Sequence, residues 1–360
     1  MSALVDPAAD DVSTTTGELE LNELDLGAHD DEWGRLAAEA GNVFGTPEWI
    51  STWWRHFGAG RRLLLTSCRG ADGELVAVLP LYVWSRRPLR VARFMGHGPG
   101  DALGPVCRSK DRAAVATALE RALEDWGVSL LVSENVPAEE GWSKLLGGRV
   151  VEHEASPVLA LDGQSWDSLL ASWSKNLRSQ VRSRERKLGR DHRVEYRLAD
   201  DPDRLEQDLD TLYALHRARW PHGSGFGSAE PFHRSFAALA LARGWFRLWL
   251  LEVDGEALAA WYGFRFANVE SYYQAGRSAD PVWEQYRLGF VLLAHSIRAA
   301  AADGAREYRF LRGDEDFKYR FASSDHGLET FIRARGRAAE AALRVSLRLP
   351  RPLRRRLSKT

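Results

Sequence analysis

The sequence has little of what would mark a secreted, metal-binding or membrane-spanning protein. It contains two cysteines, Cys68 and Cys107, without metal-type spacing, and a structural disulfide is not expected inside a cell. No apolar stretch approaches the roughly 18 residues that a membrane-spanning helix needs. The first residues lack a basic segment followed by an apolar run, so we expect no secretory signal and a cytoplasmic protein.

The chain also lacks an overall charge of one sign, since its formal net charge is −1. This excludes a global field that attracts nucleic acid, and we expect no sequence-specific nucleic-acid binding. The ends differ: residues 1–34 hold ten Asp or Glu and no Lys or Arg, and residues 344–360 hold seven Lys or Arg and no acid. We expect a disordered acidic leader (1–32) and a basic tail (336–360), which is either simply solvated or makes weak contacts with RNA or a membrane surface.

Several motifs of known enzyme classes are missing. There is no Gly-x-Ser-x-Gly elbow, phosphate-binding Walker loop or dinucleotide-binding glycine pattern. The ten histidines are scattered, and His216 and His295 fall on apolar helical faces, as core histidines do. We therefore expect no metal.

What is present fits two α/β domains, because 360 residues exceed one ordinary core. In the first half a helix starting at Pro47 precedes a hairpin with the turn Asp72-Gly73, a helix over 110–126 and a strand. The second half repeats this order, with strands at 245–253, 257–267 and 269–275, a helix over 285–303 and a last clear strand at 306–311. We predict a mixed sheet covered by helices in each half, domains over 33–155 and 160–335, and a linker near 152–164.

Two stretches of the second half could carry chemistry. The helix predicted from Gln285 begins with Arg287 and Gly289, and a helix start offers unpaired N–H groups to phosphate oxygens. Residues 310–321 mix charges with aromatic side chains just past a strand, where sites of α/β sheets gather. Packing alone could explain the first stretch, and a solvated turn could explain the second.

A third stretch, 175–190, is a basic helix with a single acid, Glu185. Lys175, Arg178 and Arg182 fall three or four residues apart and share a face. They could bind phosphates, or they could form a solvated face opposite packed leucines.

Four segments together resemble the CelD/BcsL-like branch of the GNAT superfamily, which is related to FemAB-type peptidyltransferases. The resemblance spans about residues 33–335, and the last segment is the most specific. The segments are Phe44-Gly45-Thr46-Pro47-Glu48-Trp49, Ser174-Lys175-Asn176-Leu177-Arg178, Tyr286-Arg287-Leu288-Gly289, and Leu311-Arg312-Gly313-Asp314 with Phe317-Lys318.

The resemblance implies tandem GNAT-like domains with a cleft between them and acyl transfer from acyl-CoA to an amine or hydroxyl. The acceptor stays open: a cell-envelope component, a polysaccharide or a small metabolite. Two alternatives remain, an aminoacyl-tRNA-dependent FemAB-like transferase and a non-catalytic GNAT-like binding module. Phe290 and Val291 stand where GNAT proteins usually have small residues.

If the chain is a GNAT-type acyltransferase, we expect Asp314 or Asp316 to act as the general base. We also expect backbone N–H groups of the 258–267 strand to polarise the thioester carbonyl. Lys318 would steady the carboxylate or hold an anionic acceptor. The expected donor-binding residues are Arg287, Leu288, Gly289 and Phe290. The expected acceptor-binding residues are Arg312, Tyr319, Lys175, Arg178, Arg182, His97 and Asp101.

Overall fold

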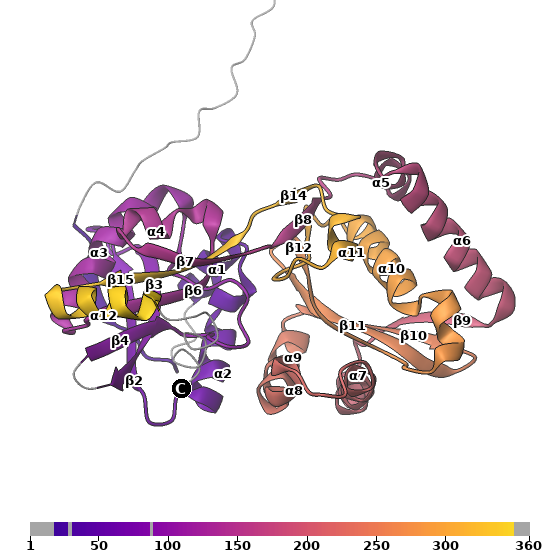
Figure 1. Cartoon of the computed structure of the whole chain (residues 1–360), viewed down its shortest axis with the longest axis horizontal. Helices are drawn as coiled ribbons and strands as arrows, with labels where there is room; N and C mark the ends of the chain where they lie inside the picture. Colours follow the sequence, from indigo (N-terminus) through magenta and orange to yellow (C-terminus); the bar gives the residue numbers. More distant parts are fainter. Residues whose placement is uncertain (1–17, 28–30, 87–88, 349–360) are drawn as a thin grey trace, which may run out of the picture.

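The computed structural model describes residues 18–27, 31–86 and 89–348. Most of the predicted acidic leader, 1–32, and the end of the predicted basic tail, 336–360, lie outside these residues. The described chain forms two lobes, each built on a mixed β-sheet with helices packed against it (Figure 1). The expected α/β class with two mixed sheets is confirmed.

The sheet of the first lobe has the order β1-β2-β3-β4-β6-β15-β7, with β5 paired to β3. Neighbouring strands are antiparallel except β4 and β6, which run parallel. Its strands are β1 (Glu20–Glu23), β2 (Arg62–Arg69), β3 (Leu75–Arg86), β4 (Leu89–Phe94), β5 (Val106–Cys107), β6 (Leu130–Pro137), β7 (Arg149–Glu154) and β15 (Leu328–Ala334).

The sheet of the second lobe has the order β14-β8-β13-β12-β11-β10-β9, and here β12 and β13 are the parallel pair. Its strands are β8 (Pro157–Ala160), β9 (Val194–Leu198), β10 (Phe246–Val253), β11 (Glu256–Phe266), β12 (Val269–Arg277), β13 (Glu307–Arg309) and β14 (Ser324–Asp325).

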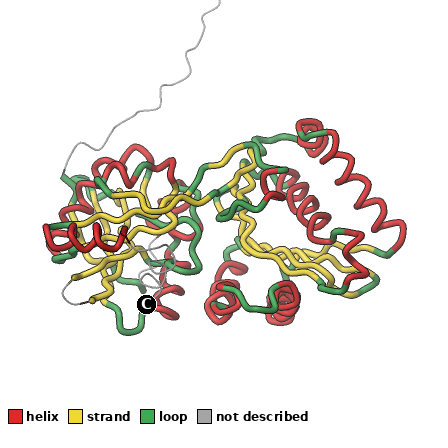
Figure 2. Tube along the Cα trace, viewed as in Figure 1, coloured by secondary structure: helices red, strands yellow, loops and turns green. Residues whose placement is uncertain are grey.

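Helices cover both faces of the second sheet, with α5, α6 and α10 on one face and α7 to α9 on the other (Figure 2). In the first lobe α12 packs against β15. The first lobe has α1 (Asp31–Glu39), α2 (Pro47–Phe57), α3 (Arg112–Asp125), α4 (Trp142–Leu145) and α12 (Arg337–Arg348). The second lobe has α5 (Trp166–Ser172), α6 (Lys175–Asp191), α7 (Leu205–Arg219), α8 (Gly225–Ser228), α9 (Glu230–Ala242), α10 (Leu288–Ala302) and α11 (Asp316–Tyr319).

Both lobes repeat one local order, a hairpin followed by a helix and a strand, as predicted. In each lobe this last strand runs parallel to the strand before the helix. Helix α3 connects β4 to β6, and α10 connects β12 to β13. The hairpin turns use Gly73 and Gly255, whose φ angles are +83° and +90°, a region that glycine enters at little cost. The duplication is therefore one of architecture.

The chain passes between the lobes in two adjacent segments. Strand β7 ends at Glu154 in the first sheet, and β8 begins at Pro157 in the second, so the predicted linker 152–164 is largely strand. On the way back, β15 enters the first sheet between β6 and β7. The domain limits 33–155 and 160–335 stay a prediction, but the sheet of the first lobe includes this strand from the far end of the chain.

An aromatic core joins the two lobes. Trp49 of α2 is fully buried, and its ring meets Phe236 and Phe232 of α9 edge-on, at centroid distances of 4.7 and 4.9 Å. The helix that carries Trp49 begins as predicted, because Thr46 Oγ1 accepts a hydrogen bond from the Trp49 N–H and Pro47 occupies the first turn. Edge-to-face aromatic pairs of this kind stabilise beyond their buried area. They hold the lobes in one arrangement.

Candidate active site

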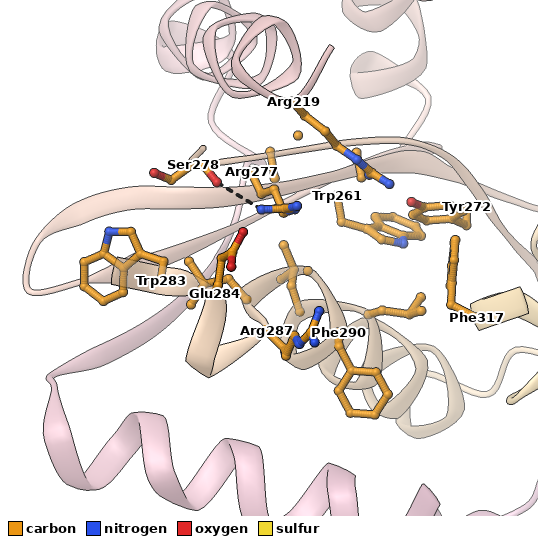
Figure 3. A pocket seen from close by; sticks show the side chains of 17 residues that line it. Arg219, Trp261, Tyr272, Arg277, Ser278, Trp283, Glu284, Arg287, Phe290 and Phe317 are labelled. Atoms are coloured by element: carbon orange, nitrogen blue, oxygen red, sulfur yellow. Dashed lines mark hydrogen bonds between the residues drawn. The ribbon is translucent and has the colours of Figure 1, made fainter. Parts of the chain in front are cut away.

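Strand β12 extends beyond its pairing with β13, and a cavity lies beside its continuing part. The two strands pair only from Val269–Glu307 to Ser271–Arg309, after which β13 ends and β12 continues to Arg277. The continuing part of β12 borders a cavity of about 280 Å³, called the first cavity, which the start of α10 closes on the other side (Figure 3). A strand edge without a neighbour offers backbone groups to an extended ligand.

The start of α10 faces the first cavity. The predicted donor-binding residues Arg287, Leu288, Gly289 and Phe290 all line it. The N–H groups of Phe290 and Val291 donate hydrogen bonds to the Arg287 carbonyl. The N–H groups of Leu288 and Gly289 come before these first helical hydrogen bonds and have no acceptor within the helix. A helix start in this geometry attracts anionic groups.

The predicted helix over 285–303 begins later than expected. Asp280 caps a 3-10 turn over Pro281–Tyr286, and Arg287 takes a left-handed conformation, with φ 54° and ψ 50°, before α10 begins at Leu288. Gly289 needs no special φ. A Cβ added there would meet a single atom within 4 Å, Cδ of Arg277 at 3.9 Å, so the glycine leaves space open to the cavity.

The pairing of the 258–267 strand gives no support to the expectation that its N–H groups polarise a bound carbonyl, which stays a prediction. That strand, β11, pairs with β10 on one side and β12 on the other along nearly all of its length. Its backbone groups are therefore engaged within the sheet. The uncovered edge belongs to β12 beyond Ser271.

A second cavity of about 200 Å³ lies between the lobes. The first lobe contributes Pro99 and Asp101, and the second lobe contributes the end of α7, part of β12 and the bend after β13. It shares four lining residues with the first cavity, so the two adjoin. These four are Arg219, Tyr272, Ala275 and Phe317. The lobes are held together here, since the Tyr273 hydroxyl donates to the Pro99 carbonyl at 2.6 Å.

Asp101 is the carboxylate of the second cavity whose pKa departs most from its ordinary value. Its side chain is 12% exposed, and Nε of Arg312 lies 3.8 Å from its Oδ1. Burial raises the pKa of Asp101 to about 6, although Arg312 and Lys318 pull it down. A carboxylate with this pKa can accept a proton near neutral pH and remain a stronger base than an exposed one.

The bend after β13 places Arg312 and Lys318 in the second cavity, as the sequence predicts. Lys318 is buried, and its Nζ donates to the Arg312 carbonyl at 2.7 Å and pairs with Glu315 at 2.9 Å. Gly313 has a φ of 123°, and a Cβ there would approach the Lys318 Nζ to 2.9 Å and run into the Glu315 carboxylate. Only glycine fits this turn.

The other predicted residues of the bend lie elsewhere. Asp314 and Asp316 are exposed and are not among the residues that line either cavity, so this placement gives their assignment as general base no support. Tyr319 is also exposed, and its hydroxyl donates to Asp325 Oδ2 at 2.6 Å. The roles predicted for these three stay predictions.

His97 belongs to a cluster beside the second cavity. Its Nε2 lies 2.7 Å from both Nη1 of Arg93 and Oε2 of Glu134. Burial, together with Arg93 and other cations, lowers the pKa of His97 to about 3, so the ring is neutral. Its neighbours Gly98 and Pro99 are among the residues that line the cavity, whereas His97 is not.

The basic helix α6 meets the candidate site at a different residue from those predicted. Arg178 donates to the carbonyls of Ala171 and Trp173, which ties α6 to α5, while Lys175 and Arg182 are exposed and line neither cavity. Arg184 instead lines an outer hollow together with Arg287. Burial lowers the pKa of Arg184, and so do the charges of Arg287 and Arg320.

Sequence reasoning missed Arg219 and Tyr272, which line both cavities. Figure 3 shows the two side chains at the first cavity. Arg219 is the last residue of α7, and Tyr272 lies on β12 where β13 has ended. Burial raises the pKa of Tyr272, while the neighbouring Arg219 guanidinium, through its charge and a side-chain hydrogen bond, lowers it. The one available signal was the glycine-rich connector after Arg219, which marks a loop near the sheet end.

Two further observations concern residues 18–27, 31–86 and 89–348. No helix in these ranges is both long and apolar enough to cross a membrane. Nor do they contain a group of three or more His, Cys, Asp or Glu that could hold a metal ion. The expectation of a metal-free protein stays a prediction.

Comparisons with known proteins find one domain model that matches part of the chain. The Acetyltransferase (GNAT) domain model matches residues 175–319, which include α10 and most of the bend. No curated protein matches the chain.

Solved structures with a similar fold cover most of the chain. FemX has a TM-score of 0.65 at 12% identity, over 91% of this chain and 100% of its own. L-PGS from Bacillus licheniformis has a TM-score of 0.53 at 14% identity, over 89% and 97%. The C-terminal domain of a protein assigned as lysylphosphatidylglycerol synthetase from Agrobacterium fabrum has a TM-score of 0.55 at 12% identity, over 88% and 94%. At these identities the likeness shows the fold alone.

Proposed function

We propose that the protein transfers an acyl group from acyl-CoA to an amine or hydroxyl of a polar acceptor, because residues 175–319 match the Acetyltransferase (GNAT) domain model. The observation that carries the proposal is the contact between the two cavities at Arg219, Tyr272, Ala275 and Phe317. A donor in the first cavity and an acceptor in the second would meet there.

The first cavity suits acyl-CoA in both shape and chemistry. CoA is an extended chain with a diphosphate towards one end and a thioester at the other. The N–H groups of Leu288 and Gly289 and the guanidinium of Arg287 would receive the diphosphate. Apolar side chains, including Trp261 and Phe317, would enclose the chain near the thioester.

The second cavity supplies a base for the acceptor. The acceptor nitrogen or oxygen attacks the thioester carbonyl and loses its proton to Asp101. A new C–N or C–O bond forms, the C–S bond breaks, and the CoA thiolate leaves and takes a proton from water. Lys318 and Arg312 hold the bend and keep Asp101 ionised by their charge.

Thiol release provides the test. The purified protein is mixed with acetyl-CoA or longer acyl-CoA esters and pools of amines and hydroxy compounds, and free CoA thiol is followed with time. Acceptor-dependent thiol release is expected, and acylated product should appear by mass spectrometry. If no CoA ester binds or reacts, acyl-CoA is not the donor.

A second candidate donor is aminoacyl-tRNA, and one observation favours it. Arg184 and Arg320 lie 5.4 and 5.3 Å from the centroid of the Phe290 ring, and Arg287 lines the hollow beside them. Within the described ranges none of these three arginines forms an ion pair with a carboxylate. RNA binding through them would weaken steeply with salt. Transfer that needs charged tRNA and is unaffected by CoA would replace the acyl-CoA proposal.

A further inference from the structure

Arg219 differs from the other charged residues of the second cavity in its partners. Lys318 pairs with Glu315 at 2.9 Å, and Arg312 lies 3.8 Å from Asp101. In the part of the chain that the structure describes, Arg219 has no carboxylate partner within ion-pair distance. Its guanidinium instead faces the junction of the cavities, beside the Tyr272 phenol (Figure 3).

The second cavity therefore has an excess of positive charge. Three cations line it, Arg219, Arg312 and Lys318, against two carboxylates, Asp101 and Glu315. Glu154 and Glu134 outside the lining also offset the charge of Arg312, and Glu315 shares its charge between Lys318 and Arg219, so the positive charge that is least compensated is that of Arg219. A negatively charged ligand would complete the balance in this partly enclosed space of about 200 Å³. An acceptor that has only a positively charged amine would be repelled.

We propose that the acceptor carries a carboxylate that binds Arg219, which makes it an amino acid or another small amine or hydroxy compound with a carboxylate. This inference rests on the proposed function, because it assigns the second cavity to the acceptor. A guanidinium fork matches a planar carboxylate with two hydrogen bonds. Lys318, whose ammonium would suit a phosphate, is already fixed to the Arg312 carbonyl and Glu315.

The test compares acceptors that differ in one charge. Glycine, β-alanine, 4-aminobutyrate, 6-aminohexanoate and L-lysine are each measured beside the corresponding primary amide, because the spacing between amine and carboxylate is open. We expect kcat/KM at least about tenfold higher for the best acid than for its amide.

Substitutions in α7 then identify the residue that binds the carboxylate of the acceptor. Arg219→Gln should remove the preference for the acid, mainly by raising the KM for the acid, with a smaller effect on the amide. Arg219→Lys should recover part of the preference. Arg217→Gln is the matched control, since Arg217 lies on the same helical turn, is exposed and pairs with Glu230 at 3.5 Å outside the cavity. It should behave as wild type.

Three results would overturn the inference, the first two with the acyltransferase intact. One is equal use of acids and amides. Another is an equal fall in kcat for both after Arg219→Gln, which would assign Arg219 to the reacting carbonyl. If no acceptor reacts, the proposed function fails. Calorimetric titration with the same acids in the absence of donor then tests the carboxylate site by itself. Binding that Arg219→Gln abolishes supports the carboxylate site, and no binding to wild type overturns it.

Discussion

Replacing Asp101 by Asn tests the chemistry most sharply, because it removes the base and keeps the shape. Asn can still accept the backbone hydrogen bond from Arg312 that Asp101 accepts. A general base contributes about 10²- to 10⁴-fold to the rate, so kcat should fall by at least ~100-fold. The KM values for donor and acceptor should change little, since the cavity keeps its volume.

The pH dependence gives an independent magnitude. The pKa of Asp101 rises from 3.8 to about 6, and the carboxylate is the active form, so wild-type kcat/KM should fall as the pH drops through about 6. Raising the pKa of Asp101 from 3.8 to about 6 corresponds to a net cost of roughly 3 kcal/mol for keeping this carboxylate ionised in the folded protein. The pKa of Asp101 is higher in the folded protein than in the unfolded chain, so the folded protein favours the protonated carboxyl. The fold therefore loses stability as the pH rises from about 4 to 6 and this carboxyl ionises.

Asp101→Asn avoids that cost. The free energy of unfolding, measured by urea titration, is compared between the variant and wild type at each pH. This difference should shift in favour of the variant by up to about 3 kcal/mol between pH 4 and pH 7. Asp314→Asn discriminates between the two proposed bases, because Asp314 is exposed and outside both cavities. The reasoning is refuted if Asp101→Asn keeps more than a third of the wild-type kcat, or if Asp314→Asn carries the loss.

Two more changes test the supports of the site. Gly313→Ala should destabilise by about 1–3 kcal/mol and lower activity, because its φ of 123° and the nearby Lys318 leave no room for Cβ. Gly304→Ala, with φ +75° and open space, feels only the backbone strain, so an equal loss in both would discount the contact with Lys318. Trp49→Ala should cost about 3–5 kcal/mol of unfolding free energy and reduce activity by loosening the lobes. Leu145→Ala, at an exposed position, should change stability by less than about 0.5 kcal/mol, and a similarly small loss for Trp49→Ala would contradict an aromatic core between the lobes.

Local signals predicted much of the fold. The hairpin turn Asp72-Gly73, the capped helix from Pro47 and the repeated order of elements follow from neighbouring residues. The path of β15 could not be predicted, because its partners on β6 and β7 lie more than 150 residues away in the chain. The delayed start of α10 depends on the 3-10 turn that Asp280 caps, which competes with the helical pattern.

The parts of the site that depend on backbone geometry could be predicted from the sequence. The parts that depend on burial were harder to predict. The helix start at Gly289 and the bend at Arg312 and Lys318 both reach the joined cavities, as their place at strand ends suggests. The choice among carboxylates was not predictable, because Asp101 owes its raised pKa to burial between two lobes. Arg219 lies where the two cavities meet, and only the folded chain brings these cavities together.

The central claim is that the space in front of α10 receives CoA, and calorimetric titration of the protein with acetyl-CoA tests it directly. Wild type should bind, and Gly289→Leu should weaken binding at least about tenfold by filling the space that the glycine leaves open. Gly189→Leu, on the exposed side of α6 with no atom within 4 Å of its Cβ, should bind as wild type does. Unchanged affinity in Gly289→Leu, or no binding to wild type, would contradict the account.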